Sequence, residues 1–360
     1  MYALLFADAG LSTARISTLF VIWSVVSFVF EVPSGAWADA WSRRRLYAIG
    51  AFLTAAGFAS WTFWPTYAGF ALGFVLWGLG GALCSGTLEA LLYDELGDGG
   101  AYARVAGRGG TVAILSMLVA TVLAAPGFAL GGYLLVGVLS VTVRAAGGCL
   151  ALGFHEAGPG TASDDAAASG YLATLRAGLG EVRGSRRVGW AVAIAALVPG
   201  FTALDEYLPL LSRAAGAPTA VVPLLFALPA LAMAVGSTLA GRWATIAPPR
   251  LAAALAAAAL LLAGGALSGR LVGMLPVALA FGILQFAIIV TETRLQESIT
   301  GSARATVLSV AGFTSEVFAV LLYAVFGAGA ALASVPVLFA LCGLPLLATA
   351  FAVRRRLPGS

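Results

Sequence analysis

The chain has 360 residues, of which 61% are hydrophobic and only 10% are charged, and its formal net charge is +4. Soluble domains carry charge on about a quarter of their residues, so this composition excludes an ordinary water-soluble protein. The positive charge does not indicate a nucleic-acid partner, because the arginines are spread through short loops and form no basic stripe. We therefore expect an integral membrane protein.

The sequence predicts no cofactor, metal or nucleotide site. Cys84, Cys149 and Cys342 lie inside apolar runs without a CxxC spacing, and His155 is the only histidine. The chain contains no lysine, which excludes the lysine-containing phosphate-binding loop of nucleotide-driven pumps. Arginine without lysine, with abundant alanine and glycine, is typical of a GC-rich bacterial genome.

Apolar runs, broken at charged residues, glycine and proline, predict an all-α polytopic membrane protein with about eleven full transmembrane helices. About 20 apolar residues in a helix cross the hydrocarbon layer of a bilayer, which is roughly 30 Å thick. The predicted spans are residues 15–38, 46–64, 67–92, 107–127, 131–154, 187–211, 217–239, 250–268, 271–296, 305–327 and 331–353.

The arginines predict the orientation of these helices. Only Arg15, Arg213 and Arg270 fall on one side of the predicted spans, whereas most of the other arginines fall on the opposite side. Cytoplasmic loops carry the excess of positive residues, so the second side is cytoplasmic. We expect a multi-pass protein of the bacterial inner membrane with a cytoplasmic C-terminus.

Similar segments indicate an internal duplication. Residues 38–41 (Ala-Asp-Ala-Trp) resemble residues 240–243 (Ala-Gly-Arg-Trp), at an offset of 202. At an offset of 203, Glu89 corresponds to Glu292, and Asp94 to Glu297. The repeat therefore predicts two halves of six helices each.

The offset also predicts the division of the chain. The N-terminal half covers residues 1–154, a cytoplasmic linker with a short amphipathic helix covers 155–186, and the C-terminal half covers 187–360. The first helix of the first half is then represented only by its tail at residues 2–6. Whether the chain lacks the rest of this helix or the sequence begins late stays open.

A loop signature follows the first full span. Residues 35–44 read Gly-Ala-Trp-Ala-Asp-Ala-Trp-Ser-Arg-Arg. This segment resembles the signature Gly-x-x-x-Asp-x-x-Gly-Arg-Arg/Lys of the major facilitator superfamily, with Ser42 in place of the usual glycine. Gly35 permits two helices to approach closely, and Asp39 and Arg43 can form an ion pair between helix ends. Such a latch stabilises one of two alternating conformations.

The resemblance implies the superfamily fold, with two parallel halves and a central substrate site at the middle of the bilayer. It also implies a secondary active transporter of a small solute that works by alternating access and is coupled to protons, with uptake or efflux open. Its expected partners are a small solute, membrane lipid and protons, and the protein is expected to be a monomer. The latch is expected to comprise Gly35, Asp39, Arg43, Arg44, Asp94 and Arg104.

Ionisable residues inside predicted spans are candidates for the substrate or proton site, because a charge in the bilayer core costs several kcal/mol. Glu316 and Arg144 lie halfway along their helices, and Asp205 and Glu206 lie in the outer third of the 187–211 helix. One of these carboxylates would carry the coupling proton. Arg144 would bind an anionic group or keep that carboxylate ionised. The alternative is a salt bridge that only fixes helix packing.

Three further glutamates, Glu31, Glu89 and Glu292, lie near the cytoplasmic ends of their spans. They are possible gates, or latches without contact to substrate. Two other functions also stay open, a membrane-embedded lipid-processing enzyme and a relative of the superfamily that does not transport. We expect a transporter rather than an enzyme, and the substrate is beyond the reach of the sequence.

Overall fold

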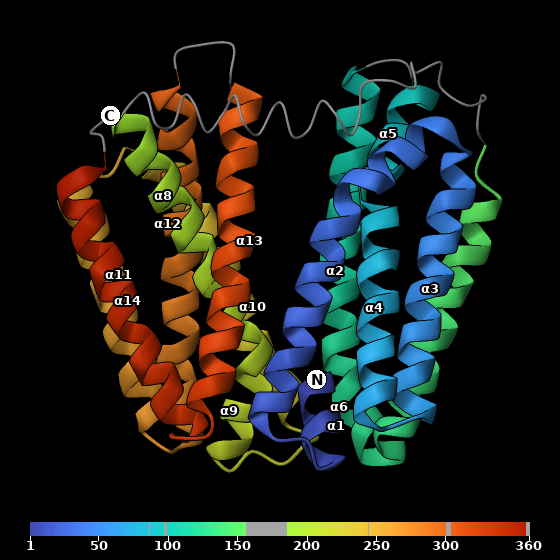
Figure 1. Cartoon of the computed structure of the whole chain (residues 1–360), viewed down its shortest axis with the longest axis horizontal. Helices are drawn as coiled ribbons and strands as arrows, with labels where there is room; N and C mark the ends of the chain where they lie inside the picture. Colours follow the sequence, from blue (N-terminus) through green and yellow to red (C-terminus); the bar gives the residue numbers. More distant parts are fainter. Residues whose placement is uncertain (86, 97–98, 156–185, 244, 300–303, 358–360) are drawn as a thin grey trace. The chain divides into compact units, whose positions relative to one another are not determined.

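The chain is built from long helices in the computed structural model (Figure 1). The structure describes residues 1–85, 87–96, 99–155, 186–243, 245–299 and 304–357. Within these residues every regular element is helical, which confirms the predicted all-α class. The side chains of Asp39, Glu89 and Asp94 and the surroundings of Gly35 also lie outside the described part of the structure, although the helices that contain these residues are described.

Contacts divide the chain into two compact units. The N-terminal unit comprises Leu5–Tyr171, and the C-terminal unit comprises Leu172–Ser360 together with Met1–Leu4. Nearly all of the predicted linker, with its amphipathic helix, falls within residues 156–185 and therefore outside the described residues.

The first part of the chain forms six helices. They are α1 (Tyr2–Asp8), α2 (Thr13–Ala40), α3 (Arg43–Phe63), α4 (Tyr67–Cys84), α5 (Thr87–Leu96) and α6 (Gly99–Leu152). The predicted 67–92 span is divided between α4 and α5, because the chain at Ser85 is extended rather than helical. In this unit α3 packs against both α4 and α6.

Helix α6 is two spans joined at Gly132. This glycine has φ 58° and ψ −152°, a left-handed conformation that glycine adopts without steric cost. The side chain of Val136, after the break, lies beside Gly127 before it, so the chain doubles back there. The described residues contain ten segments able to span a membrane, and the one that contains Gly132 is long enough for two. The prediction of about eleven spans is therefore confirmed.

Glycines bring α3 and α4 into close contact. A Cβ atom on Gly50 would lie 2.7 Å from the carbonyl oxygen of Gly80, and one on Gly57 would lie 2.6 Å from that of Gly73. Both pairs are seven residues apart on their helices, so they recur after two turns on the same face. Small residues at such crossings let helix backbones approach in a membrane, where lipid leaves helices without a hydrophobic force between them.

Aromatic rings fill the core of the N-terminal unit. Phe6 is fully buried, and its ring centroid lies 5.5 Å from that of Trp61, 4.3 Å from that of Phe70 and 5.7 Å from that of Phe74. The indole Nε1 of Trp61 donates to the carbonyl oxygen of Phe70 at 3.0 Å, so its polar group is satisfied although it is buried. These contacts fix the short α1 helix on α3 and α4.

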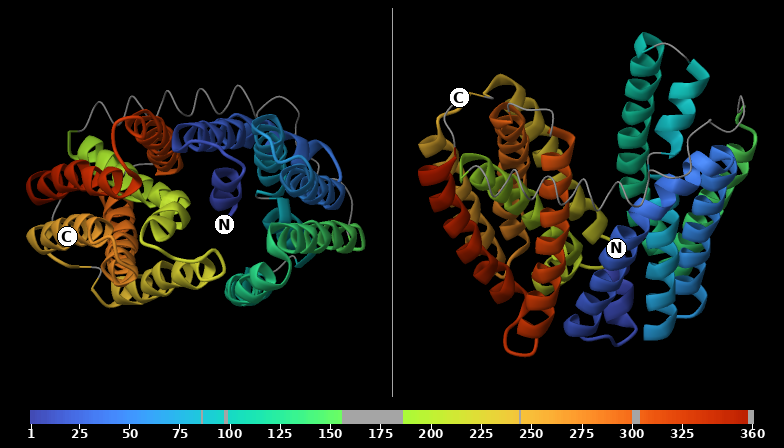
Figure 2. Two further views of the ribbon diagram at one scale, coloured as in Figure 1. Left: turned by 90° about the horizontal axis from the view of Figure 1, so that it is seen from below. Right: turned by 45° about the horizontal axis from the view of Figure 1, so that its top comes forward.

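The C-terminal unit is organised around α12, which packs against α8, α10 and α11. The view along the helices shows α12 among these three neighbours (Figure 2, left). The elements are α8 (Arg186–Gly200), η1 (Phe201–Tyr207), α9 (Leu208–Ala214), α10 (Val222–Arg242), α11 (Pro248–Leu267), η2 (Leu271–Gly273), α12 (Met274–Ser298), α13 (Arg304–Gly329) and α14 (Val335–Arg356).

The predicted span over 187–211 is found as the segment Val188–Ala214, but it is not one uninterrupted α-helix. The chain forms α8, then the 3-10 helix η1, then the short helix α9. Pro199 lies in the last turn of α8, and Pro209 lies in the first turn of α9. Proline has no backbone N–H and therefore interrupts the hydrogen-bond ladder of a helix. The tighter η1 segment carries Asp205 and Glu206.

The glycine contacts between α3 and α4 can be tested with neighbouring residues. A Cβ atom on Gly80 would overlap the carbonyl oxygen of Gly50 and the hydroxyl of Thr54, whereas one on Gly81 meets nothing within 4 Å. We expect Gly80→Ala to destabilise the protein by about 1–3 kcal/mol, the usual cost of overpacking. Gly81→Ala should leave the thermal unfolding midpoint in detergent unchanged or raise it. Equal midpoints for the two variants would contradict this account of the packing.

Candidate functional site

A polar cavity opens among α8, α12 and α13 of the C-terminal unit. Its volume is about 280 Å³. Glu292 and Gln296 of α12 and Ser315 and Glu316 of α13 supply its polar lining. The apolar lining consists of Ala195, Pro199, Leu295, Leu308, Ala311 and Gly312.

Helix geometry explains why these polar groups share one cavity. Glu292 and Gln296 are four residues apart and therefore lie on the same face of α12. Glu316 lies near the middle of α13, and both glutamate side chains are exposed. Two carboxylates, an amide and a hydroxyl can bind a proton, a cation or the hydroxyl groups of a solute. The sequence named both glutamates but assigned them to different roles, and the structure brings them together.

The acidic pair Asp205 and Glu206 lies in η1, and both residues are half-buried. The phenol of Tyr2 donates a hydrogen bond to Oε2 of Glu206. The next residue, Tyr207, is buried and stacks on Phe326 with ring centroids 3.9 Å apart. This stack holds η1 against α13. Sequence reasoning missed Tyr2, because no local pattern connects residues 204 positions apart.

Arg144 belongs to the N-terminal unit, where it is half-buried on α6. Its Nη2 atom donates to the Sγ atom of Cys84 at 3.8 Å. Its buried Nε atom has no hydrogen-bond partner within the part of the chain that the structure describes. Arg144 and Glu316 therefore belong to different units, and the predicted roles of both remain predictions.

The superfamily-like signature falls at the junction of α2 and α3. Gly35 and Asp39 lie in the last turns of α2, and Arg43 and Arg44 lie in the first turn of α3. Ser42, which replaces the usual glycine, is the N-cap of α3, and its hydroxyl accepts a hydrogen bond from the backbone N–H of Arg45 at 3.4 Å. Serine is among the preferred N-cap residues, which gives this departure a structural role.

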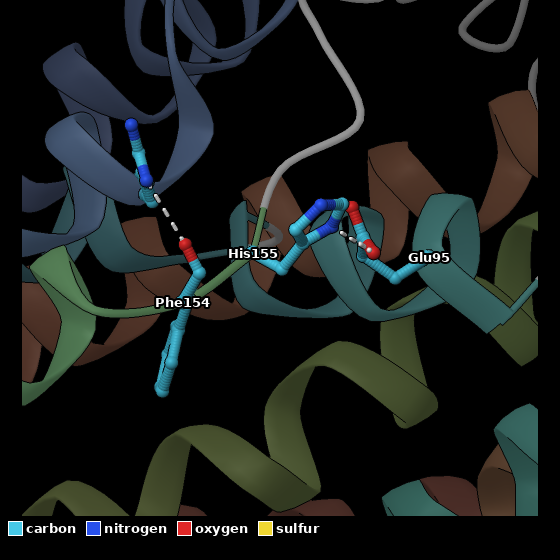
Figure 3. A network of polar contacts seen from close by, with 4 residues as sticks. Glu95, Phe154 and His155 are labelled. Carbon is cyan, nitrogen blue, oxygen red and sulfur yellow. Dashed lines mark hydrogen bonds and ion pairs between the residues drawn. The ribbon is translucent and has the colours of Figure 1, made fainter.

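Polar contacts tie three helix ends together beside this signature (Figure 3). Nη1 of Arg44 donates to the carbonyl oxygen of Phe154 at 3.1 Å, just beyond the end of α6. His155 Nδ1 lies 2.9 Å from Oε2 of Glu95 on α5, and the two side chains face each other in the picture. Neither His155 nor Glu95 was among the predicted latch residues. The ends of α3, α5 and α6 are thus joined by side chains.

The remaining latch and gate residues are placed only in part. Arg104 is exposed near the start of α6. Glu31 is exposed on α2, and its Oε1 atom accepts a hydrogen bond from Ser85 at 3.0 Å. The side chains of Asp39, Glu89 and Asp94 lie outside the described residues, so the predicted latch pairing stays a prediction.

Comparison with known families decides the classification. The family model described as Major Facilitator Superfamily matches residues 1–322. The chain belongs to the major facilitator superfamily. No curated protein matches the chain.

Solved transporters of this superfamily share the fold of the chain. The nucleoside transporter NupG is 13% identical, with a TM-score of 0.75 over 98% of this chain and 92% of NupG. The D-xylose-proton symporter is 14% identical, with a TM-score of 0.68 over 98% and 91% of the two chains. The fucose:proton symporter FucP of E. coli is 16% identical, with a TM-score of 0.51 over 99% and 95%.

Identities this low show the fold of the superfamily and no particular substrate. The predicted superfamily fold is confirmed, and the chain is a multi-span membrane protein. Membership and fold together support a secondary transporter rather than an enzyme.

The contact between Tyr2 and Glu206 gives a prediction about stability. Tyr2→Phe removes the hydroxyl and leaves the half-buried Glu206 carboxylate without this donor. A hydrogen bond to a charged group contributes about 1.5–3 kcal/mol to the free energy of unfolding. We expect a lower thermal unfolding midpoint in detergent. Tyr67→Phe is the matched control, because the Tyr67 hydroxyl lies 3.0 Å from the uncharged, exposed hydroxyl of Thr18.

A double variant isolates this interaction from other effects of the phenol. Tyr2→Phe should lower the thermal unfolding midpoint much less in a Glu206→Gln background than in the wild type, because the effects of substitutions at two residues in contact are not additive. Strictly additive effects of the two substitutions would show that the hydrogen bond does not stabilise the protein.

Proposed function

We propose that this chain is a proton-coupled secondary transporter that carries a small polar solute across the membrane by alternating access. The observation that carries the proposal is the cavity lined by Glu292 and Glu316. It lies among helices α8, α12 and α13, which contain segments long and apolar enough to span a bilayer. Ionisable side chains are costly in such helices and are retained mainly where they serve a function.

Two carboxylates in one small cavity can couple protons to conformation. A confined cavity removes part of the water around an ionised carboxylate, so binding of a proton or a cation there is favoured. A conformational change that alters the access of water to the cavity changes this preference, and the proton is then released on the other side. Glu316 is the proposed coupling carboxylate, and Glu292 is its partner in the cavity.

The rest of the cavity lining suits a neutral polar solute. The Gln296 amide and the Ser315 hydroxyl offer donors and acceptors next to an apolar wall. The names of the structural neighbours specify a nucleoside, D-xylose and fucose as their solutes, all rich in hydroxyl groups. A nucleoside or sugar is therefore the first class of solute to test here.

The other predicted residues have subsidiary roles in this proposal. Asp205 and Glu206 form a second acidic site in the C-terminal unit, held by Tyr2. Arg144, whose Nε atom is buried, is the proposed group for an anionic part of the solute or for a carboxylate. The signature residues Asp39 and Arg43 form the proposed latch, and Glu31, Glu89 and Glu292 are proposed to gate the pathway.

The same proposal includes the surroundings of the protein. The arginine distribution supports insertion in the inner membrane of a bacterium, with the C-terminus in the cytoplasm. The transporter is proposed to act as a monomer, with lipid as its surroundings.

The coupling role of Glu316 is tested by Glu316→Gln in proteoliposomes. A panel of nucleosides and sugars is first screened by thermal shift of the purified protein to find a solute. Uptake of that solute driven by an imposed proton gradient should fall at least tenfold in the variant. Exchange of labelled for unlabelled solute without a gradient should persist, because it requires no proton release.

Glu297→Gln is the matched control, because Glu297 lies on the same helix as Glu292 but does not line the cavity. This variant should retain gradient-driven uptake. Normal gradient-driven uptake by Glu316→Gln would remove Glu316 from the coupling role. Loss of both uptake and exchange would instead assign Glu316 to solute binding.

A further inference from the structure

A second, apolar groove lies on the C-terminal unit, separate from the polar cavity. Its volume is about 350 Å³, and α10, α11 and α12 line it. Its lining includes Leu279, Ile283 and Phe286 of α12 and Ala254 of α11. No residue of the groove lines the cavity that contains Glu316.

A glycine contact between α10 and α12 explains why the groove exists. A Cβ atom on Gly236 would overlap the carbonyl oxygen of Gly282, and one on Gly282 would lie 2.8 Å from that of Ala232. Both glycines line the groove. The helices cross closely there, and the absence of side chains leaves a furrow between the larger residues that flank the crossing.

Several apolar residues of the groove are exposed at the surface of the protein. Val235 is 57% exposed, Leu279 is 56% exposed and Trp243 is 58% exposed. Exposed apolar side chains on a membrane-spanning helix face lipid tails. An acyl chain is therefore chemically matched to the furrow, and a polar solute is not.

Two arginines flank the turn at one end of the groove. Trp243 and Ile246 line that end and belong to the short turn between α10 and α11. Arg242 precedes this turn and Arg250 follows it, and both side chains are exposed. Trp243 directly follows the membrane-spanning segment in α10, and tryptophan is enriched at the membrane–water interface.

A buried arginine fixes the position of this turn. Arg294 of α12 is only 3% exposed, and its Nη2 atom donates to the carbonyl oxygen of Ile246. Glu297, one turn further along α12, interacts electrostatically with Arg294. Arg294 is therefore a structural support of the turn, and the charges available at the surface are those of Arg242 and Arg250.

We infer that this groove is a binding site for an anionic glycerophospholipid. One acyl chain lies in the furrow over Leu279 and Ile283, and the phosphate lies between Arg242 and Arg250. The arginine distribution along the chain predicts that this end faces the cytoplasm, where the inner leaflet supplies anionic lipid. The inference does not depend on the transported solute or on proton coupling.

The test measures which lipids stay bound to the full-length protein. The protein is reconstituted in vesicles of equal parts phosphatidylglycerol and phosphatidylcholine, extracted gently, and its bound lipids are counted by native mass spectrometry. The wild type should retain phosphatidylglycerol in preference to phosphatidylcholine. In Arg242→Gln/Arg250→Gln that preference should fall about fivefold for each arginine removed. A fivefold change corresponds to roughly 1 kcal/mol, the usual contribution of one basic residue at a membrane surface.

Two matched controls separate the groove from general effects. Arg354→Gln/Arg355→Gln removes the same charge at the end of α14, outside the groove lining, and should keep the preference. Ala254→Phe fills the groove and should remove one bound lipid of either kind. Ala253→Phe places the same ring on the exposed neighbouring position of α11, which does not line the groove, and should remove none.

Several outcomes would overturn the inference. An unchanged lipid preference in Arg242→Gln/Arg250→Gln would show that these arginines do not bind the headgroup. This variant changes only exposed side chains, so it should fold like the wild type. Equal numbers of bound lipids in Ala254→Phe and Ala253→Phe would show that the groove does not bind an acyl chain. A dimer that disappears in Ala254→Phe while phosphatidylglycerol stays bound would assign the groove to a second copy of the chain.

Discussion

The structure depends on one constraint, namely that a chain surrounded by lipid must satisfy its backbone hydrogen bonds internally. Helices meet this constraint, but lipid then gives them no hydrophobic reason to associate. Close backbone approach supplies the attraction instead. Gly50 and Gly57 of α3 meet Gly80 and Gly73 of α4 in one unit, and Gly236 meets Gly282 in the other. Close contacts at glycine therefore pack helices in both units. In the C-terminal unit, Gly236 and Gly282 also line the apolar groove.

The packing of the helices determines where the few ionisable side chains within them lie. In the C-terminal unit Glu292 and Glu316 share one polar cavity, and Glu206 is held by Tyr2. In the N-terminal unit the guanidinium of Arg144 contacts a thiol, and its Nε atom finds no hydrogen-bond partner among the described residues. The apolar groove among α10, α11 and α12 shares no lining residue with this polar cavity.

Local patterns in the sequence predicted the features that local forces determine. Apolar runs gave the spans, including the two that meet at Gly132, and the 35–44 signature indicated the superfamily. The patterns failed where proline broke a run, so the 187–211 helix was predicted without its η1 segment. They could not place Glu292 and Glu316 in one cavity, or join Tyr2 to Glu206, because these arrangements depend on how the helices pack in three dimensions.

The central claim is that the cavity lined by Glu292 and Glu316 opens alternately to the two sides of the membrane. Its most direct test places a thiol at the lining position by Ser315→Cys, in a chain whose Cys84, Cys149 and Cys342 are replaced by serine. A membrane-impermeant thiol reagent is then applied to vesicles of each orientation. We predict reaction from both sides, in a ratio that shifts when solute binds. Reaction from one side only, unchanged by a solute that stabilises the protein, would contradict the account.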